Sequence, residues 1–183
     1  KSLEQSTPSE VGALRVLIAG IVLLPLAILN IKKFPRKHLK WLIIAAVTGN
    51  FIPMFLFPIA ETQISSSIAG IINSMMPIFV IIVGTLFWKF STSKRQLIGV
   101  AISFSGACIL ALSGGESGEL KLIPIVLLLL ATLCYAISTT TVKSKLHEIP
   151  AKILSAFVFS FVLILPSLIT LVFSGFFNNL HAN

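Results

Sequence analysis

Residues 123–131 read Ile-Pro-Ile-Val-Leu-Leu-Leu-Leu-Ala, an unbroken run without a polar side chain. The run lies inside a longer apolar stretch, 122–142. A helix of about 20 such residues crosses the roughly 30 Å hydrocarbon core of a bilayer. A strand of a membrane barrel would instead alternate apolar and polar residues. The stretch therefore predicts a membrane-spanning helix.

Five more stretches of this kind lie along the chain, and together they predict its architecture. The expected spans are 11–30, 40–60, 65–88, 96–112, 122–142 and 151–174. The 183 residues are 56% hydrophobic and only 11% charged, whereas a soluble domain carries about 25% charge. Lipid offers the backbone no hydrogen bonds, so each span must satisfy its own amides as a helix. We expect an all-α, polytopic transmembrane helix bundle with six spans.

The loops between these spans alternate in charge. Three loops hold eleven of the fourteen basic residues: Lys32, Lys33, Arg36, Lys37 and Lys40; then Lys89, Lys94 and Arg95; then Lys143, Lys145 and Lys152. The intervening segments hold five of the six acids: Glu4, Glu10, Glu61, Glu116 and Glu119. Lysine and arginine concentrate in cytoplasmic loops, so both ends should lie outside and the basic loops inside. This threading explains the net charge of +8, and we expect no nucleic-acid partner.

Prolines and small residues mark places where the spans bend or pack. Five prolines lie inside the expected spans: Pro25, Pro53, Pro58, Pro77 and Pro166. Each removes a backbone hydrogen bond, which gives either ordinary kinks or bends that open a cavity between helices. Small residues recur every fourth position at Ser66, Gly70 and Ser74 and at Gly99, Ser103, Ala107 and Ala111. Such spacing lets helix backbones approach closely, so the third and fourth spans should be neighbours.

A family resemblance follows from the segment between Ala60 and Leu112. It reads Ala60-Glu-Thr-Gln-Ile-Ser-Ser-Ser-Ile-Ala-Gly-Ile-Ile-Asn-Ser-Met-Met-Pro77-Ile-Phe, then Gly84, Gln96-Leu-Ile-Gly99 and Ser105-Gly106. This order of small-residue helix, proline-aromatic pair, polar loop and glycine-studded helix resembles the EamA domain of the drug/metabolite transporter superfamily. Leu14–Ala19 and Ala131–Ala136 are similar to two further helices of that family.

The resemblance implies a ten-span transporter built from two inverted five-helix repeats. Residues 1–112 would then be most of the first repeat without its first helix, 113–121 an outer linker, and 122–183 the truncated start of the second repeat. The chain would be a fragment of a longer transporter. A faint repeat points the same way: Ala19–Pro25 is similar to Ser160–Pro166, at an offset of 141 residues or five spans. Inverted repeats of this kind are common in secondary transporters.

Polar residues inside the spans are the candidate substrate contacts: Arg15, Asn50, Asn73, Ser74 and Tyr135. Arg15 either faces a cavity and attracts an anionic group, or reaches the outer interface, or pairs with Glu10. Pro77 has no amide hydrogen to bond the carbonyl of Asn73, so Asn73 offers both a carbonyl and an amide. Hydrogen bonding between helices is the alternative role for such amides. Ser138 and Thr139 to Thr141 cluster in the inner half of the fifth expected span, and the threonines rank lower because threonines commonly bond back to their own helix.

The sequence favours a permease or exporter that moves a small-molecule metabolite by alternating access in the bacterial inner membrane. Its expected partners are the lipid bilayer and the metabolite, and a homodimer is also considered. One alternative is a small multidrug-type dimeric antiporter, which needs an acid inside a span; another is a non-transporting membrane scaffold subunit. We expect no enzymatic activity, catalytic residue, cofactor or metal site, since the histidines lie in loops and Cys108 and Cys134 read as apolar fillers.

Overall fold

The computed structural model describes residues 8–33, 36–113 and 121–174. Every regular element in these ranges is a helix. The prediction of an all-α polytopic bundle is confirmed, and the long helical stretches begin and end within a few residues of the expected spans. Apolar run length fixes these ends, because a helix in lipid must extend until its backbone reaches water.

Six long helical stretches follow one another along the chain. They are α1 (Pro8–Asn30); α2 (Leu39–Ala46), the π-helix η4 (Val47–Phe51) and α3 (Ile52–Glu61); α4 (Ser66–Ser74) and α5 (Met76–Trp88); α6 (Lys94–Ser113); α7 (Leu122–Lys145); and α8 (Ala151–Phe157), the π-helix η5 (Val158–Leu163) and α9 (Ile164–Phe173). Two 3₁₀ turns, η2 (Ile31–Lys33) and η3 (Arg36–His38), lie in the first connection.

Five of these stretches are long and apolar enough to cross a membrane, among the residues the structure describes. They are Glu10–Asn30, Arg36–Glu61, Ser67–Trp88, Leu122–Lys145 and Ala151–Phe173. The remaining long helix, α6, has 20 residues and corresponds to the expected span 96–112. The total of six spans stays a prediction.

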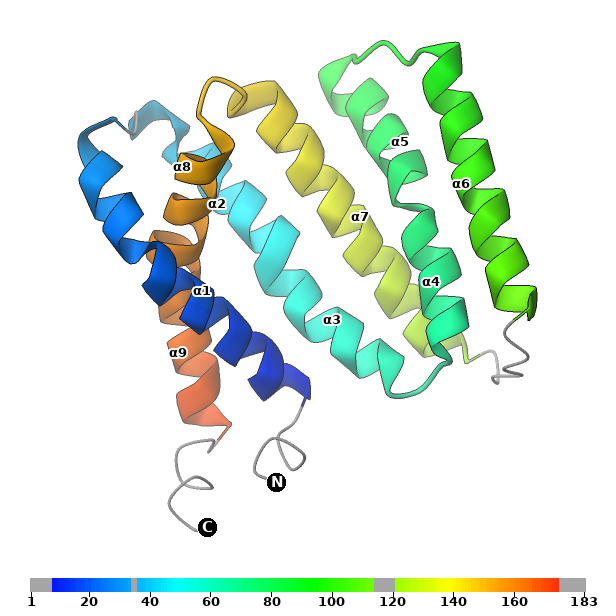
Figure 1. The fold of residues 1–183 in the computed structure, drawn as a ribbon, viewed down its shortest axis with the longest axis horizontal. Coiled ribbons are helices and arrows are strands. Elements are labelled where there is room, and N and C mark those ends of the chain that lie inside the picture. The colour runs from blue at the N-terminus through cyan, green and yellow to red at the C-terminus, as the bar shows by residue number, and fades with distance from the viewer. Residues whose placement is uncertain (1–7, 34–35, 114–120, 175–183) are drawn as a thin grey trace.

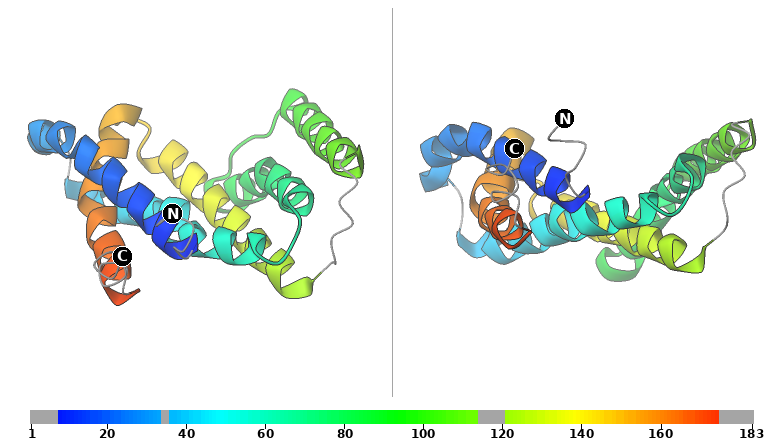
Figure 2. Two further views of the ribbon diagram at one scale, coloured as in Figure 1. Left: turned by 60° about the horizontal axis from the view of Figure 1, so that its bottom comes forward. Right: turned by 90° about the horizontal axis from the view of Figure 1, so that it is seen from below.

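The helical stretches stand in a row whose order differs from their order in the chain (Figures 1 and 2). The central helix is α7, which contacts α2, η4 and α3 on one side and α4 and α5 on the other. The last stretch, α8 to α9, lies beside α1, and α6 lies at the far edge next to α4 (Figure 1). Segments from both ends of the chain are therefore neighbours.

All three basic connections lie on one side of the bundle, where they join the same ends of the helices. The described parts of these connections, 31–33 with 36–38, 89–93 and 146–150, lie at the top of Figure 1, whereas α1 begins and α9 ends at the bottom. We call the end of the bundle that holds these three connections, where the chain passes between helices at the top of Figure 1, the basic end. This is the arrangement that alternating loop charge predicts, and the assignment of the basic end to the cytoplasm stays a prediction.

Two apolar cores hold the row together. The one nearer the basic end joins α1, α2, α8 and η5 through residues that include Ala27, Leu42, Phe157 and Leu163. The one at the opposite end joins α3, α4 and α7 through Ala60, Ala69, Ile72 and Leu128, with Ile64 from the α3–α4 connection. Other large apolar side chains point outward, for example Leu29, which is 80% exposed. Outward apolar faces are what a bilayer requires.

Three of the five prolines follow an interruption of their helix. The segment η4 ends two residues before Pro53, the turn at Met75 lies two residues before Pro77, and η5 ends three residues before Pro166. Proline cannot donate to the carbonyl four residues earlier, so the hydrogen-bond ladder shifts just ahead of it. In contrast, α1 runs through Pro25 to Asn30, and α3 contains Pro58.

The small residues pack differently from the prediction. As expected, α4 contacts α6. A Cβ added at Gly70 or Gly99 would meet nothing within 4 Å, however, so the predicted close approach at these two glycines is wrong. Close approaches occur at other glycines: an added Cβ would lie 2.7 Å from the Phe159 carbonyl oxygen at Gly20 and 2.9 Å from the Ser138 Cβ at Gly49.

Candidate functional site

Interrupted helices mark a common depth in the bundle. Both π-helices and the turn at Met75 lie near the middle of their helical stretches, at 47–51, 75 and 158–163. The prolines that follow leave the carbonyls of Gly49, Asn73 and Val162 without their usual helical donor. Backbone groups of this kind are tolerated inside a membrane only where protein or a watery cavity surrounds them. Polar backbone groups inside the bundle are therefore concentrated near its middle.

Two predicted site residues lie on elements that face the central helix. Asn50 is within η4, which packs against α7, and its side chain is half-buried. Tyr135 lies near the middle of α7 and is half-buried. Its ring packs against that of Phe57 on α3, with 5.7 Å between the centroids. The amide of Asn50 forms no hydrogen bond with any described residue.

Asn73 and Ser74 lie at the turn between α4 and α5, and they differ in environment. Ser74 is half-buried and its Oγ donates to the Ile71 carbonyl at 2.6 Å. Asn73 is exposed on the outside of the described bundle. The side chains of Asn50, Asn73, Ser74 and Tyr135 share a depth but form no hydrogen bonds with one another within the described ranges.

Arg15 lies apart from the other predicted site residues. It is exposed near the first third of α1 and shares a face of that helix with Ile18 and Val22, which are 54% and 70% exposed. The structure does not bring it together with Asn50, Ser74 or Tyr135. Its attraction for an anionic substrate stays a prediction.

Two serines join helices across the bundle, and sequence reasoning missed both roles. Ser138 on α7 donates to the Ala45 carbonyl at 2.8 Å, and Ser160 in η5 donates to the Gly20 carbonyl at 2.8 Å. Thr140, as expected of the threonines in this segment, donates within its own helix to the Ala136 carbonyl at 2.8 Å. Ser138 itself lies at the close approach to Gly49, whereas at Gly20 the close atoms belong to Phe159, the neighbour of Ser160, and to Ile164. The available signal was a glycine in one span and a serine in another. It can be used only when one knows which two spans are neighbours.

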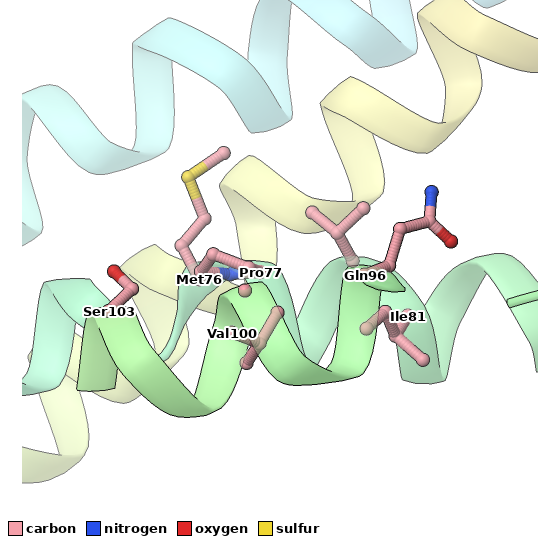
Figure 3. A pocket seen from close by; sticks show the side chains of 8 residues that line it. Met76, Pro77, Ile81, Gln96, Val100 and Ser103 are labelled. Carbon is pink, nitrogen blue, oxygen red and sulfur yellow. The ribbon is translucent and has the colours of Figure 1, made fainter. Parts of the chain in front are cut away.

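A shallow apolar groove adjoins the turn at Met75. It lies between α5 and α6, has a volume of about 370 Å³ and is lined by Met76, Pro77, Val80, Ile81, Gln96, Gly99, Val100 and Ser103 (Figure 3). Only Gln96 and Ser103 bring polar side chains to it. The predicted site residues do not line this groove, and its surface suits an apolar occupant.

At the basic end, a cation and two aromatic rings connect three helical stretches. The Lys145 Nζ of α7 lies 5.5 Å from the ring centroid of Trp41 on α2 and 5.4 Å from that of Trp88 on α5. The two indoles meet edge to face at 5.5 Å. We call these residues the Trp41–Trp88–Lys145 cluster. Tryptophans near the ends of membrane spans commonly anchor them at the interface, and here the structure also pairs the two with each other.

A second contact at this end ties α5 to α7. Lys89 adopts left-handed backbone angles with φ of 53°, which turns the chain so that the Phe90 amide donates to the Gly84 carbonyl at 3.0 Å. A residue in the left-handed conformation is a common way to end a helix, and here it directs two successive amides, those of Lys89 and Phe90, to the Gly84 carbonyl. The Phe90 ring then packs over Gly84, and the Lys143 Nζ lies 4.8 Å from its centroid. The basic end is therefore closed by packing among α2, α5 and α7.

No group of three histidine, cysteine or carboxylate side chains in residues 8–33, 36–113 and 121–174 is placed to hold a metal ion. The polar groups at mid-depth are amides, hydroxyls and backbone carbonyls. They can bind a ligand through hydrogen bonds, and they offer no nucleophile with an adjacent base.

Membrane-length helices interrupted near their midpoints define a multi-pass membrane protein. A family profile, that of the EamA-like transporter family, matches residues 1–112, and the chain belongs to this family.

Several relatives carry transporter names. The chain is 27% identical over 142 residues to an uncharacterized transporter of Archaeoglobus fulgidus, which covers 78% of this chain and 50% of that protein. It is 31% identical over 121 residues to the uncharacterized inner membrane transporter YedA of Escherichia coli, covering 64% of this chain and 39% of YedA. YdfC of Bacillus subtilis, also an uncharacterized transporter, is 27% identical over 115 residues. The chain spans at most half the length of these relatives, and no solved structure matches it.

Proposed function

We propose that this chain forms part of a transporter that moves a small polar metabolite by alternating access across the bacterial inner membrane. Membership of the EamA-like family and the transporter names of its relatives support transport. The name of YedA supports the inner membrane. The division at 113–121 into two inverted repeats is part of this proposal, and the family match over 1–112 supports it.

One observation carries the proposal: three helical stretches are interrupted near their midpoints, beside Asn50 and Ser74. Secondary transporters bind substrates near the bilayer midplane at discontinuous helices, where unwound backbone and a few side chains are exposed to the ligand. We place Asn50, Ser74 and Tyr135 at this site. Asn73 supplies its carbonyl, and its exposed side chain would contact substrate only through a surface that further helices complete.

The substrate chemistry follows from the groups at this depth. The Asn50 amide can donate and accept, and the hydroxyls of Ser74 and Tyr135 can do either. Neutral donors and acceptors suit an uncharged or zwitterionic molecule with several hydrogen-bonding groups. The Trp41–Trp88–Lys145 cluster packs α2, α5 and α7 together at the basic end. The core that contains Ala60 and Leu128 packs α3, α4 and α7 at the opposite end, and together these contacts support a state in which the site is closed to both sides.

The test is transport by the full transporter that contains this chain, reconstituted in proteoliposomes with a panel of radiolabelled neutral amino acids, nucleosides and sugars. Saturable flux of one class supports the proposal. Asn50→Ala should then raise the half-saturating concentration about tenfold, the effect of losing about 1.4 kcal/mol of binding. Asn30→Ala is the matched control, because Asn30 lies at the basic end and donates to the Leu26 carbonyl. Equal effects of both changes would remove Asn50 from the substrate site, and flux for no class would argue for a scaffold. Unchanged affinity in Arg15→Ala and Arg15→Lys would remove Arg15 from the anion role.

A further inference from the structure

A second, larger groove lies on the flank of the bundle at the basic end. Its volume is about 540 Å³, and it runs between the start of α2 and the stretch α8–η5. Its floor includes Phe157, which is 2% exposed. Its rims include Leu39, Ile43 and Phe161, which are 49%, 44% and 43% exposed. None of the mid-depth site residues lines it.

The groove matches the depth of one leaflet. It reaches from Arg36 in η3, at the basic end, to Val162 in η5, near the middle of its helical stretch. The helical path from Ala151 to Val162 rises about 16 Å at about 1.5 Å per residue. Half of the hydrocarbon core is about 15 Å thick. An acyl chain lying along the groove would therefore extend from the interface to the bilayer midplane.

The basic residues at the end of the groove nearest Arg36 favour a lipid with an anionic headgroup. Arg36 lines the groove, is exposed, and has no ion pair or hydrogen bond with the described residues. Lys32, Lys37 and Lys40 are exposed on the adjoining turns and helix start. Among the described acids, only Glu148 lies at this end of the row. A guanidinium forms paired hydrogen bonds with a phosphate, and basic pockets between helices on the cytoplasmic side bind anionic headgroups.

We propose that this groove binds one anionic phospholipid of the inner leaflet, with its phosphate on Arg36 and an acyl chain against Ile43, Phe157 and Phe161. The lipid would bridge η3 and α2 to the last helical stretch, two parts of the chain that meet in the core at this end. This site is separate from the proposed metabolite site and does not depend on transport.

The first experiment is native mass spectrometry of the purified chain titrated with phosphatidylglycerol or, at equal chain length, phosphatidylcholine. We expect one tightly retained phosphatidylglycerol. Arg36→Gln should weaken its retention about five- to tenfold, the effect of losing one charged hydrogen-bonding partner. Arg95→Gln removes the same charge from the start of α6, at the same end but away from the groove, and should leave retention unchanged. Equal retention of both lipids, or equal effects of both substitutions, would overturn the proposal.

A second experiment locates the lipid without relying on any variant. Phosphatidylglycerol with a photoactivatable acyl chain should label peptides that contain 39–43 or 157–162. Labelling confined to other outward faces would mean ordinary solvation by lipid. A dimer mass together with unlabelled groove peptides would mean that a second copy of the chain fills the groove. Either result would refute the assignment.

Discussion

Replacing Lys145 with methionine should loosen the basic end of the bundle. Lys145→Met keeps an unbranched side chain and removes the ammonium that lies 5.5 Å and 5.4 Å from two indole centroids. A cation–π contact contributes about 0.5–1 kcal/mol at a partly exposed site. Lys145 is half-buried, so its two contacts together should stabilise the closed end by about 1–2 kcal/mol. That amount shifts an opening equilibrium about five- to thirtyfold.

The opening can be measured by the reactivity of a cysteine placed just below the cluster. Thr141 lies one helical turn before Lys145 on α7 and is 2% exposed. In a background with Cys108 and Cys134 changed to alanine, Thr141→Cys should react slowly with a membrane-impermeant maleimide added to inside-out vesicles. Adding Lys145→Met should raise the rate about five- to thirtyfold, as derived from the two contacts.

Two further variants decide whether the cluster causes the change. Lys152→Met removes the same charge from the start of α8, where no aromatic contact is found among the described residues, and should leave the rate unchanged. In a Trp88→Leu background, Lys145→Met should have a smaller effect, since interacting residues give non-additive changes. An unchanged rate in Lys145→Met, or the same acceleration in Lys152→Met, would refute the reasoning.

Two other predictions concern packing between helices and can be checked by thermal unfolding in detergent. Gly49→Ala should destabilise the protein by about 1–3 kcal/mol, because its new Cβ would press on Ser138. Gly70→Ala, where the space is open, should not lower the unfolding midpoint. Equal losses of stability in the two variants would contradict the reasoning. Ser160→Ala should lower the free energy of unfolding by about 0.6 kcal/mol, because it removes a hydrogen bond between helices. Ser105→Ala loses only a bond within α6 and should lower it less. The reverse order would show that the bond between helices is not stabilising.

The parts of the fold that depend on local sequence could be predicted. Run length fixed the ends of the helical stretches, loop charge matched the grouping of the connections, and Pro77 marked the turn at Met75. Pro53 and Pro166 signalled a disturbance but not its form, a π-helix, in which carbonyls pair one residue further along the same helix, as the Val47 carbonyl does with the Ile52 amide.

Contacts between distant segments could not be predicted from the same patterns. Ser160 meets Gly20 across 140 residues of chain, and Ser138 meets Ala45 across 93. Asn50 and Tyr135 were identifiable as polar residues in apolar runs, but their position along a shared row depends on α7 standing between α3 and α5. The Trp41–Trp88–Lys145 cluster likewise combines residues from three stretches, each of which has an ordinary interface role when taken alone.

The central position of α7 has a consequence for biosynthesis. Leu128, Ala131 and Thr132 of α7 are fully buried in the row, and Leu128 completes the core that Ala60 and Ile72 begin. While the ribosome makes residues 1–112, α3 and α5 lack the helix that will separate them. Until α7 leaves the translocon, the space between α3 and α5 must therefore stay unfilled or be occupied by another helix. A chain that ended after α6 would therefore leave Ala60 and Ile72 without the helix that completes their core.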